Sequence, residues 1–315
     1  MDTIKTEQEL KDMPTTYRQV FQNTFTNSID KTKIVTAKYN DVITDFDVEI
    51  ADFLFRFRYA TIKQLYTYLT IVGKIEEGMD ETDLKARLDK LVKMYKVLNK
   101  FVLSPYEAAS FAGDDLEFYC LDLGGAFLLH NFTDETLESI RSWRPKNANL
   151  HTVQAVYRDF KVVSFYLKLL DVFGTDLVSF DPYKRMTYDK NQTTVTFDFC
   201  VERDDIHTYF IGEIITDEEI IQRFAKSADA IEQIVSTNAW RKYYLDIERP
   251  PVLLYFVDDD DSALEIAQGL ALRQIDKFRI TTMDRVDNGD LSTAFMVFDK
   301  NVGELRLGKS KFFEK

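Results

Sequence analysis

The sequence predicts an α+β protein of two domains, and two observations carry this prediction. Residues 46–145 hold three apolar patterns of helical spacing, followed by two short β segments. From residue 151 onward, helical patterns alternate with short apolar strands, which is typical of an α/β layer structure. Pro145 and the asparagine-rich run after it mark a boundary. We therefore expect domains over residues 46–145 and 151–315, preceded by an N-terminal arm over residues 1–45.

The composition narrows the classes of function. The chain is 45% hydrophobic, which is ample for packed cores, and its two cysteines are too few for a disulfide framework. It has neither an apolar run long enough to span a bilayer nor the apolar core of a secretory signal at its start, so we expect a cytoplasmic protein without membrane association. The formal net charge is −13, with acidic residues in excess in both halves, so any DNA-binding surface must be local.

The arm is polar, and we expect it to be loosely ordered, with one short helix and one strand near Lys33–Ala37. The first helix of the next domain follows, with Asp45 or Asp47 as its N-cap. A second helix, in TIKQLYTYLTIV, opens at Ala60 or Thr61, and the glycine after it ends it.

The third helix lies in the stretch from Asp80 to Leu103 and runs into the first of two strands. Its apolar face is made of residues at helical spacing, Leu84, Leu88, Leu91, Val92, Tyr95 and Leu98. The strands are Val97–Ser104 and Leu116–Asp122, joined by a long hairpin tip, and LGGAFLLHNF predicts a short closing helix. Three helices followed by a β-hairpin are the arrangement of a winged helix-turn-helix.

The second domain opens with a long helix from His151, after which the apolar period changes from that of a helix to that of a strand. The later elements alternate along the chain as strands Thr194–Glu202, Thr208–Ile215, Pro251–Val257 and Leu291–Asp299, with helices from about Glu218 to Ser236 and from Ser262 to about Asp276.

This order of elements resembles the replication-relaxation family of plasmids and integrative conjugative elements. The matching segments are TIKQLYTYL and ETDLKARLDKLVKMYKVL for the winged helix, His151 in HTVQAVYRDF for the linking helix, and VTFDFCVERDDIHTYFIGEI for the second half. The resemblance covers roughly residues 45–260. It implies a second domain similar to a degenerate PD-(D/E)xK nuclease fold, and action in plasmid replication, DNA relaxation or transfer.

The winged helix is the main candidate for DNA contact, because a helix-turn-helix places its third helix in the major groove. The polar residues expected to contact DNA are Thr61, Lys63, Gln64, Thr82, Lys85, Arg87, Lys90 and Lys93. Over residues 81–100, six basic side chains stand against three acidic ones. However, Asp80, Glu81 and Asp83 begin the third helix. Acidic residues there are ordinary partners of the helix dipole, but they oppose phosphate contact, so a protein-docking role for this module stays open.

Asp198 and Glu213 are the candidate catalytic and metal-binding residues. The implied nuclease fold holds Mg²⁺ or Mn²⁺ between two carboxylates on adjacent strands, and a lysine two residues after the second carboxylate helps to activate water. Here Ile215 stands at the lysine position, and Lys226 on the next helix is a candidate substitute. We therefore favour an inactive nuclease fold that serves as a scaffold.

The remaining candidate motifs do not favour a further catalytic or metal-binding site. The histidines, His130, His151 and His207, show no zinc spacing with Cys120 and Cys200, and the chain has no Walker, Rossmann or Gly-x-Ser-x-Gly motif. Asp258–Asp261 is expected to be a solvated turn that caps the helix at Ser262, with a cation site as the alternative. Lys309, Lys311, Phe312 and Phe313 are expected to form a loosely ordered tail or one that docks on a partner.

The sequence therefore favours a non-enzymatic DNA-binding accessory protein of mobile-element replication, transfer or its regulation. Its expected partners are double-stranded DNA and other replication or transfer proteins, and homodimer formation is left open. The alternatives are a metal-dependent nuclease that uses Asp198 and Glu213, and an interaction scaffold that does not bind DNA.

Overall fold

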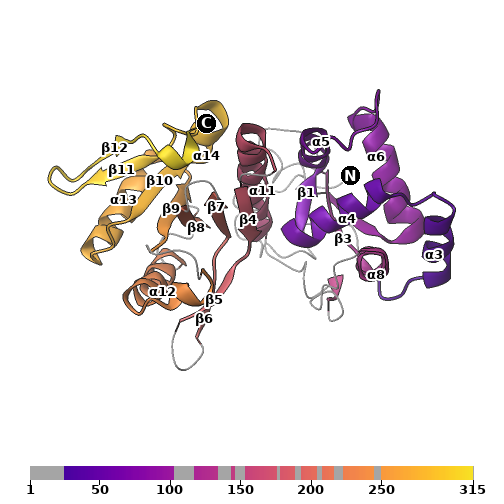
Figure 1. Ribbon diagram of the computed structural model, residues 1–315, viewed down its shortest axis with the longest axis horizontal. Coiled ribbons are helices and arrows are strands. Elements are labelled where there is room, and N and C mark those ends of the chain that lie inside the picture. Colours follow the sequence, from indigo (N-terminus) through magenta and orange to yellow (C-terminus); the bar gives the residue numbers. More distant parts are fainter. Residues whose placement is uncertain are drawn as a thin grey trace, which may run out of the picture. The chain divides into compact units, whose positions relative to one another are not determined.

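The computed structural model describes residues 25–102, 117–133, 143–145, 153–175, 178–188, 193–203, 208–215, 223–244 and 250–314. The chain divides into two compact units, Met1–Val163 and Ser164–Lys315. It has the predicted α+β class, with a large mixed sheet in unit 2 (Figure 1). The division falls within helix α11 (Val153–Phe173), after the boundary expected at residues 145–151. No helix in the described ranges is both long and apolar enough to cross a membrane.

Three helices of unit 1 begin at local caps. Helix α4 (Asp45–Phe57) is capped by Thr44, whose backbone N–H donates to Asp47, rather than by Asp45 or Asp47 itself. Helix α5 (Ile62–Ile71) is capped by Thr61, as expected. Helix α6 (Glu81–Lys90) is capped by Asp80. All three helices lie where the apolar pattern predicts them.

The sheet of unit 1 has the strand order β1-β3-β2 and is antiparallel throughout, with strands β1 (Tyr59–Thr61), β2 (Leu98–Val102) and β3 (Glu117–Leu121). After α6 the chain makes one π-helical turn, Leu91–Tyr95, and then Lys96 takes a left-handed conformation, with φ of 53°. The chain thereby turns directly into β2. The strand pair is confirmed, whereas its predicted hairpin tip lies outside the described residues.

Helices α3 (Lys31–Tyr39) and α8 (Leu123–Phe132) pack against each other. The strand predicted near Lys33–Ala37 is wrong, because this segment lies within α3. Its N-cap, Asp30, accepts a hydrogen bond from the backbone N–H of Lys33 at 3.0 Å, and its buried residues, Ile34 and Ala37, are one helical turn apart. The short closing helix expected in LGGAFLLHNF is α8.

Unit 2 contains a seven-stranded sheet in the order β12-β11-β10-β9-β8-β7-β4. Its central strands β8, β9 and β10 are parallel, and the outer pairs are antiparallel. The strands are β4 (Val178–Pro182), β7 (Phe199–Arg203), β8 (Thr208–Ile214), β9 (Val252–Val257), β10 (Phe278–Thr282), β11 (Met296–Asp299) and β12 (Glu304–Leu307). Strands β4, β10 and β12 had no counterpart among the predicted elements.

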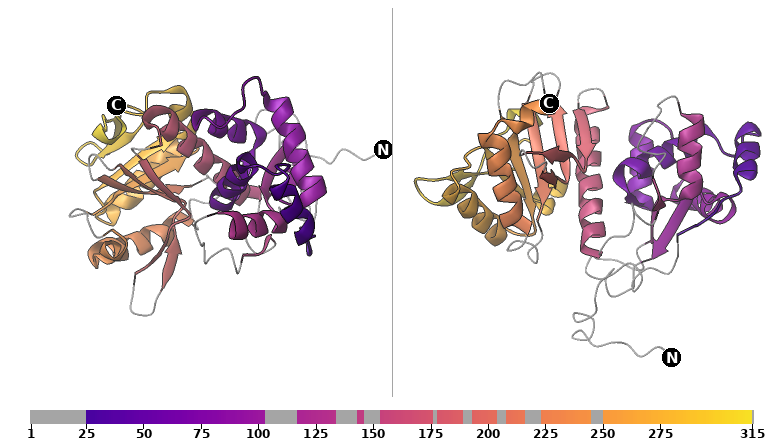
Figure 2. Two further views of the ribbon diagram at one scale, coloured as in Figure 1. Left: turned by 45° about the vertical axis from the view of Figure 1, so that its right-hand side comes forward. Right: turned by 90° about the horizontal axis from the view of Figure 1, so that it is seen from below.

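Helices cover both faces of this sheet. Helices α12 (Ala225–Ser236) and α13 (Asp260–Leu272) pack on one face, and residues 164–173 of α11 lie on the other (Figures 1 and 2). Helix α14 (Met283–Asn288) joins β10 to β11. Unit 2 is therefore a three-layer structure with an apolar core on each side of the sheet.

The predicted strand Thr194–Glu202 is interrupted at Asp198. Its first part is β6 (Thr194–Thr196), which pairs with β5 (Arg185–Thr187) in a separate two-stranded ribbon, and its second part is β7. The backbone carbonyl of Asp198 accepts a hydrogen bond from Tyr183 N–H at 2.9 Å at the point where the two parts separate. Asp198 therefore stands at the start of a sheet strand rather than inside one.

The last residues are part of the core of unit 2, so the prediction of a loose or docking tail is wrong. Phe312 and Phe313 are 2% and 1% exposed, and they lie in the short turn η5 (Lys311–Phe313). The ring of Phe313 stacks on Phe295 with a centroid distance of 4.4 Å. The guanidinium of Arg203 donates to the carbonyl oxygens of Phe312 at 2.5 Å and Glu314 at 2.6 Å, which satisfies backbone groups that burial would otherwise leave unpaired.

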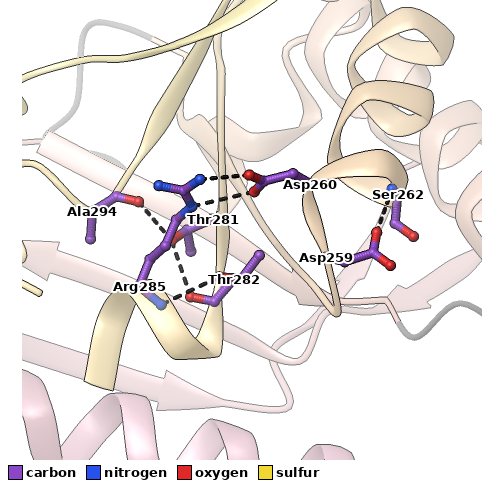
Figure 3. Close-up of polar contacts among 7 residues, drawn as sticks. All are labelled: Asp259, Asp260, Ser262, Thr281, Thr282, Arg285 and Ala294. Carbon is purple, nitrogen blue, oxygen red and sulfur yellow. Dashed lines mark hydrogen bonds and ion pairs between the residues drawn. The ribbon is translucent and has the colours of Figure 1, made fainter. Parts of the chain in front are cut away.

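The acidic turn after β9 caps a helix, as predicted (Figure 3). The Asp259 carboxylate accepts a hydrogen bond from Ser262 N–H at 2.8 Å at the start of α13. Asp260 accepts one from Arg285 at 2.7 Å, and Thr282 caps α14. Asp259 and Asp260 therefore have structural roles, at the start of α13 and in a contact with Arg285 of α14.

Candidate functional site

The surface of α5 and α6 holds the residues predicted to contact DNA, and four of the eight are exposed. These four are Lys63, Thr82, Lys90 and Lys93. The Nζ atom of Lys93 lies 3.8 Å from Asp89, one helical turn earlier, which is the geometry of a weak surface ion pair. Lys63 and Lys90 are therefore the exposed basic candidates that form no ion pair within the described residues.

Thr61 and Gln64 hold the start of α5 in place. The Thr61 hydroxyl accepts from Gln64 N–H at 3.2 Å, and the Gln64 side chain accepts from Thr61 N–H at 3.0 Å. The Gln64 amide also donates to the Phe160 carbonyl at 2.9 Å. Both side chains therefore act within the fold of unit 1.

Arg87 binds a buried carboxylate inside unit 1. Its Nε and Nη2 atoms donate to the two oxygens of Asp47 at 2.6 and 2.9 Å, and Nη2 also donates to the Thr44 hydroxyl at 2.8 Å. Asp47 is 1% exposed. The hydrogen bond to Asp47 raises the pKa of Arg87 and outweighs the opposing effect of burial. Arg87 thus joins α6 to the first turn of α4.

Lys85 lies at the edge of the same surface and is 44% exposed. Its Nζ atom is 2.5 Å from a carboxylate oxygen of Glu117 on β3, and Lys100 on β2 lies 2.9 Å from the other oxygen. Burial opposes ionisation of Glu117, but the hydrogen bonds from Lys85 and Lys100 prevail and lower its pKa. Much of the charge of Lys85 is therefore balanced within the unit.

The first turn of α6 is acidic and exposed. Asp80 accepts hydrogen bonds from the N–H groups of Thr82 and Asp83 at 2.8 and 2.9 Å, which is ordinary capping. Glu81 and Asp83 are also exposed. The exposed side of α6 is therefore acidic at its start and basic from Lys90 onward.

Asp198 and Glu213 are brought together in unit 2. Phe199 on β7 pairs with Gly212 on β8, so Asp198 and Glu213 occupy the next positions on these antiparallel strands. Glu213 also pairs in register with Tyr255 on β9. The two carboxylates are 5% and 3% exposed, so the site lies in the interior rather than in an open cleft.

Arg223 occupies this carboxylate site, and sequence reasoning missed it. Its Nη2 atom lies 2.7 Å from each carboxylate oxygen of Asp198, and its Nη1 atom donates to the Ile214 carbonyl at 2.6 Å. Asp198 also accepts from Ile214 N–H at 2.8 Å. Arg223 lies 25 residues after Asp198 in the sequence. No local sequence pattern indicates a contact over that separation.

The carboxylates at this site do not fit a divalent metal ion, because the positively charged guanidinium of Arg223 already binds both oxygens of Asp198. Ile215, at the expected lysine position, is fully buried. Lys226 is exposed on α12, whereas the next residues, Ser227 and Ala228, are buried. An arginine remains protonated and so cannot act as the base that a lysine or carboxylate can be.

The other candidate ligands are dispersed. Cys120 and Cys200 are buried in different units, and burial raises the pKa of the Cys200 thiol to about 12. His130 is exposed at the end of α8, and His151 and His207 lie outside the described residues. Within the part of the chain that the structure describes, no group of three or more His, Cys, Asp and Glu side chains could hold a metal ion.

Comparisons of the chain with protein-family models, with curated proteins and with solved structures give no match in any of the three. The resemblance to the replication-relaxation family therefore rests on the sequence segments and the order of elements alone.

Proposed function

We propose that this chain is a non-enzymatic DNA-binding protein that contacts duplex DNA through unit 1. The observation that carries the proposal is the order of elements: α4, β1, α5, α6, β2 and β3, with the sheet order β1-β3-β2. This order supports a winged helix-turn-helix, in which the third helix, here α6, enters the major groove. The role as an accessory protein of a mobile element rests on the family resemblance, and unit 2 would then contact other replication or transfer proteins.

The set of proposed contact residues is smaller than the set of basic residues predicted from the sequence. Lys63, Lys90 and Lys93 are exposed, and Lys85 is half-exposed. These lysines would contact phosphates and position the protein, whereas Thr82 on the exposed first turn would contact a base. Arg87 is not included, because its guanidinium binds Asp47 inside the unit.

The nuclease alternative has less support. Asp198 is bound by Arg223 on both oxygens, and Ile215 stands where a lysine is needed. We therefore propose that unit 2 uses this site for stability. Cleavage of plasmid DNA in the presence of Mg²⁺ or Mn²⁺ that is lost in Asp198→Ala would contradict this proposal.

The test is binding of labelled duplex DNA by the full chain, from low to physiological salt. Wild type should bind more weakly as salt rises, because phosphate contact releases counterions. A Lys63→Ala/Lys90→Ala variant should lower the slope of log K against log salt by about 2, since each lysine accounts for about one phosphate.

A Glu81→Gln/Asp83→Asn variant is the matched control, because it removes two negative charges from the same surface and should bind more tightly. If wild type shows no salt-sensitive binding at low salt, the DNA proposal fails. The acidic first turn of α6 would then favour the reading of this surface as a protein-docking site.

A further inference from the structure

Unit 1 carries a pocket that combines aromatic rings with cations, and the proposed duplex-binding residues are not among those that line it. The pocket has a volume of about 370 Å³ and is lined by one face of α8 together with residues from near α3 and from residues 143–144. Its chemistry comes from Phe127 and Trp143 and from Lys31, His130 and Arg144. The Nζ atom of Lys31 lies 5.6 Å from the centre of the Phe127 ring. Both aromatic side chains are only partly buried, so ring surface remains accessible.

A second pocket, of about 360 Å³, adjoins the first. Thr26 and Asp122 line the second pocket, and their chain neighbours Asn27 and Leu123 line the first. The Thr26 hydroxyl donates to Asp122 at 2.6 Å between them. The cations of the second pocket are Lys93, Lys96 and Lys100.

The charge of this region differs in sign from that of the chain. Its basic side chains are Lys31, Lys33, Lys93, Lys96, Lys100 and Arg144, and among the described residues its acidic ones are Asp30, Asp89, Asp122 and Glu117, the last of which binds Lys100. Lys33 belongs to it because its Nζ atom lies 5.4 Å from the centre of the Tyr95 ring, next to Lys96. Asp89 contacts both Lys93 and Lys100, and Asp122 is buried between the pockets. A chain with a net charge of −13 thus has a locally basic strip with accessible rings.

A flat aromatic group that carries negative charge fits this combination, and nucleotides have that chemistry. Proteins that bind single-stranded nucleic acid stack bases on aromatic side chains and hold the phosphates along a basic groove. Two adjoining pockets offer cations for successive phosphates, which a strand supplies and one nucleotide does not. We propose that this strip, the two pockets together, binds single-stranded DNA, with bases on Phe127 and Trp143 and phosphates on Lys31, Lys96 and Arg144.

This inference goes beyond the proposed duplex binding, because the two surfaces share only Lys93 and otherwise use different residues. Lys63 and Lys90 do not line either pocket, and Lys31 and Lys96 are not among the proposed duplex contacts. The two activities can therefore fail separately. A protein with both surfaces would hold a duplex and a strand separated from it.

The first experiment titrates the full chain with an oligothymidylate of about 15 nucleotides and follows tryptophan fluorescence, because a single-strand site spans about 4–16 nucleotides. The chain has two tryptophans, and Trp240 is 1% exposed, so a bound base should quench Trp143 selectively. The expected result is saturable quenching that weakens as salt rises. Quenching by thymidine monophosphate without any binding of the oligonucleotide would overturn the proposal.

Variants then test the residues by anisotropy of a labelled oligonucleotide. Phe127→Leu and Trp143→Leu keep an apolar side chain but remove the flat ring, and each should weaken single-strand binding by about tenfold, the size of one lost stacking contact. Lys31→Glu/Lys96→Glu should abolish it at physiological salt and leave duplex binding in place. The melting temperature of each variant shows whether it is folded.

Lys63→Glu/Lys90→Glu is the matched control, with the same change in charge on the α5–α6 surface. It should lose duplex binding and keep single-strand binding. The proposal is overturned if folded wild type does not bind the oligonucleotide at low salt, if the ring variants bind as wild type does, or if only the control variant loses single-strand binding. Loss of duplex binding by the Lys31→Glu/Lys96→Glu variant, with single-strand binding kept, would also overturn the proposal.

Discussion

Arg87 in unit 1 and Arg223 in unit 2 each bind a buried aspartate, and the two pairs leave their candidate sites in different states. Arg87 binds the buried Asp47, and Lys63 and Lys90 of the neighbouring surface remain exposed. Arg223 binds Asp198, which is itself the candidate residue, so the carboxylate site is filled from within. The comparison teaches that a charged residue is available for function only where no distant part of the chain has already supplied its partner.

The largest expected effect comes from Arg223→Ala. Without the guanidinium, the neighbouring buried carboxylates of Asp198 and Glu213 lose the positive charge of Arg223. This should lower the free energy of unfolding by about 3–5 kcal/mol. Urea denaturation of the full chain measures this change. Lys226→Ala is the control, since Lys226 is exposed on the same helix and its removal should cost less than about 0.5 kcal/mol. Equal effects of the two substitutions would mean that the Asp198 pair does not stabilise unit 2.

Arg87→Ala should have a smaller effect, because it leaves only Asp47 buried without its cation. We expect a loss of about 2–4 kcal/mol in the free energy of unfolding of unit 1. Lys90→Ala on the same helix is the exposed control, with an expected loss within about 0.5 kcal/mol. If Arg87→Ala retained full stability but lost duplex binding, Arg87 would belong to the DNA surface after all.

Glu117 should make the stability of unit 1 depend on pH. Its pKa is lowered in the folded chain from the ordinary value of 4.5, so the unfolded state takes up a proton first as pH falls. The contribution, about 0.5–1 kcal/mol for a half-exposed network of this kind, is complete above the ordinary pKa and is lost as pH falls through the folded pKa. Denaturation of wild type and Glu117→Gln at pH values from neutral to acid should show a difference that shrinks in this window. A difference that grew toward acid pH would contradict this assignment.

The smallest expected effect is that of divalent metal. Because Arg223 lies against both oxygens of Asp198, adding Mg²⁺ or Mn²⁺ should leave the melting temperature of wild type unchanged. A rise in melting temperature that follows metal concentration and is lost in Asp198→Ala would mean that Arg223 yields to a metal ion. The carboxylate site of unit 2 would then be available to a ligand, and its contrast with the α5–α6 surface of unit 1 would be wrong.

Local signals explain how much of the fold the sequence predicts. The starts of α5 and α6 are predictable because each cap and its partner are three residues apart: Thr61 with Gln64, and Asp80 with Asp83. The β-branched run of α3 suggests a strand until Asp30 is recognised as a cap. The sequence does not predict strand β10, because it contains a polar residue, Thr281, that is fully buried. The Thr281 hydroxyl donates a hydrogen bond at 2.8 Å to the carbonyl of Ala294, which lies later in the chain (Figure 3).

The candidate sites are harder to predict than the fold. The alignment of Asp198 with Glu213 follows from the spacing of two neighbouring strands, and this part is visible in the sequence. The pairs Arg87–Asp47 and Arg223–Asp198 join residues 40 and 25 positions apart, and neither periodicity nor a motif indicates such a contact. Sequence patterns locate the charged residues, but only the tertiary arrangement decides which charges remain available.

The burial of Phe312 and Phe313 has a consequence for how the chain folds during its synthesis. The ring of Phe165, at the start of unit 2, packs against Phe313 at its far end, with a centroid distance of 6.4 Å. Ribosomes add about 5–20 residues per second, so Phe313 is synthesised on the order of ten seconds after Phe165. This side of the core cannot be completed before then. Unit 1 ends at Val163, so its residues are synthesised before those of unit 2 and it can fold first. The nascent chain would then carry a folded unit 1 beside an incomplete, apolar sheet face, which is the form that a chaperone would meet.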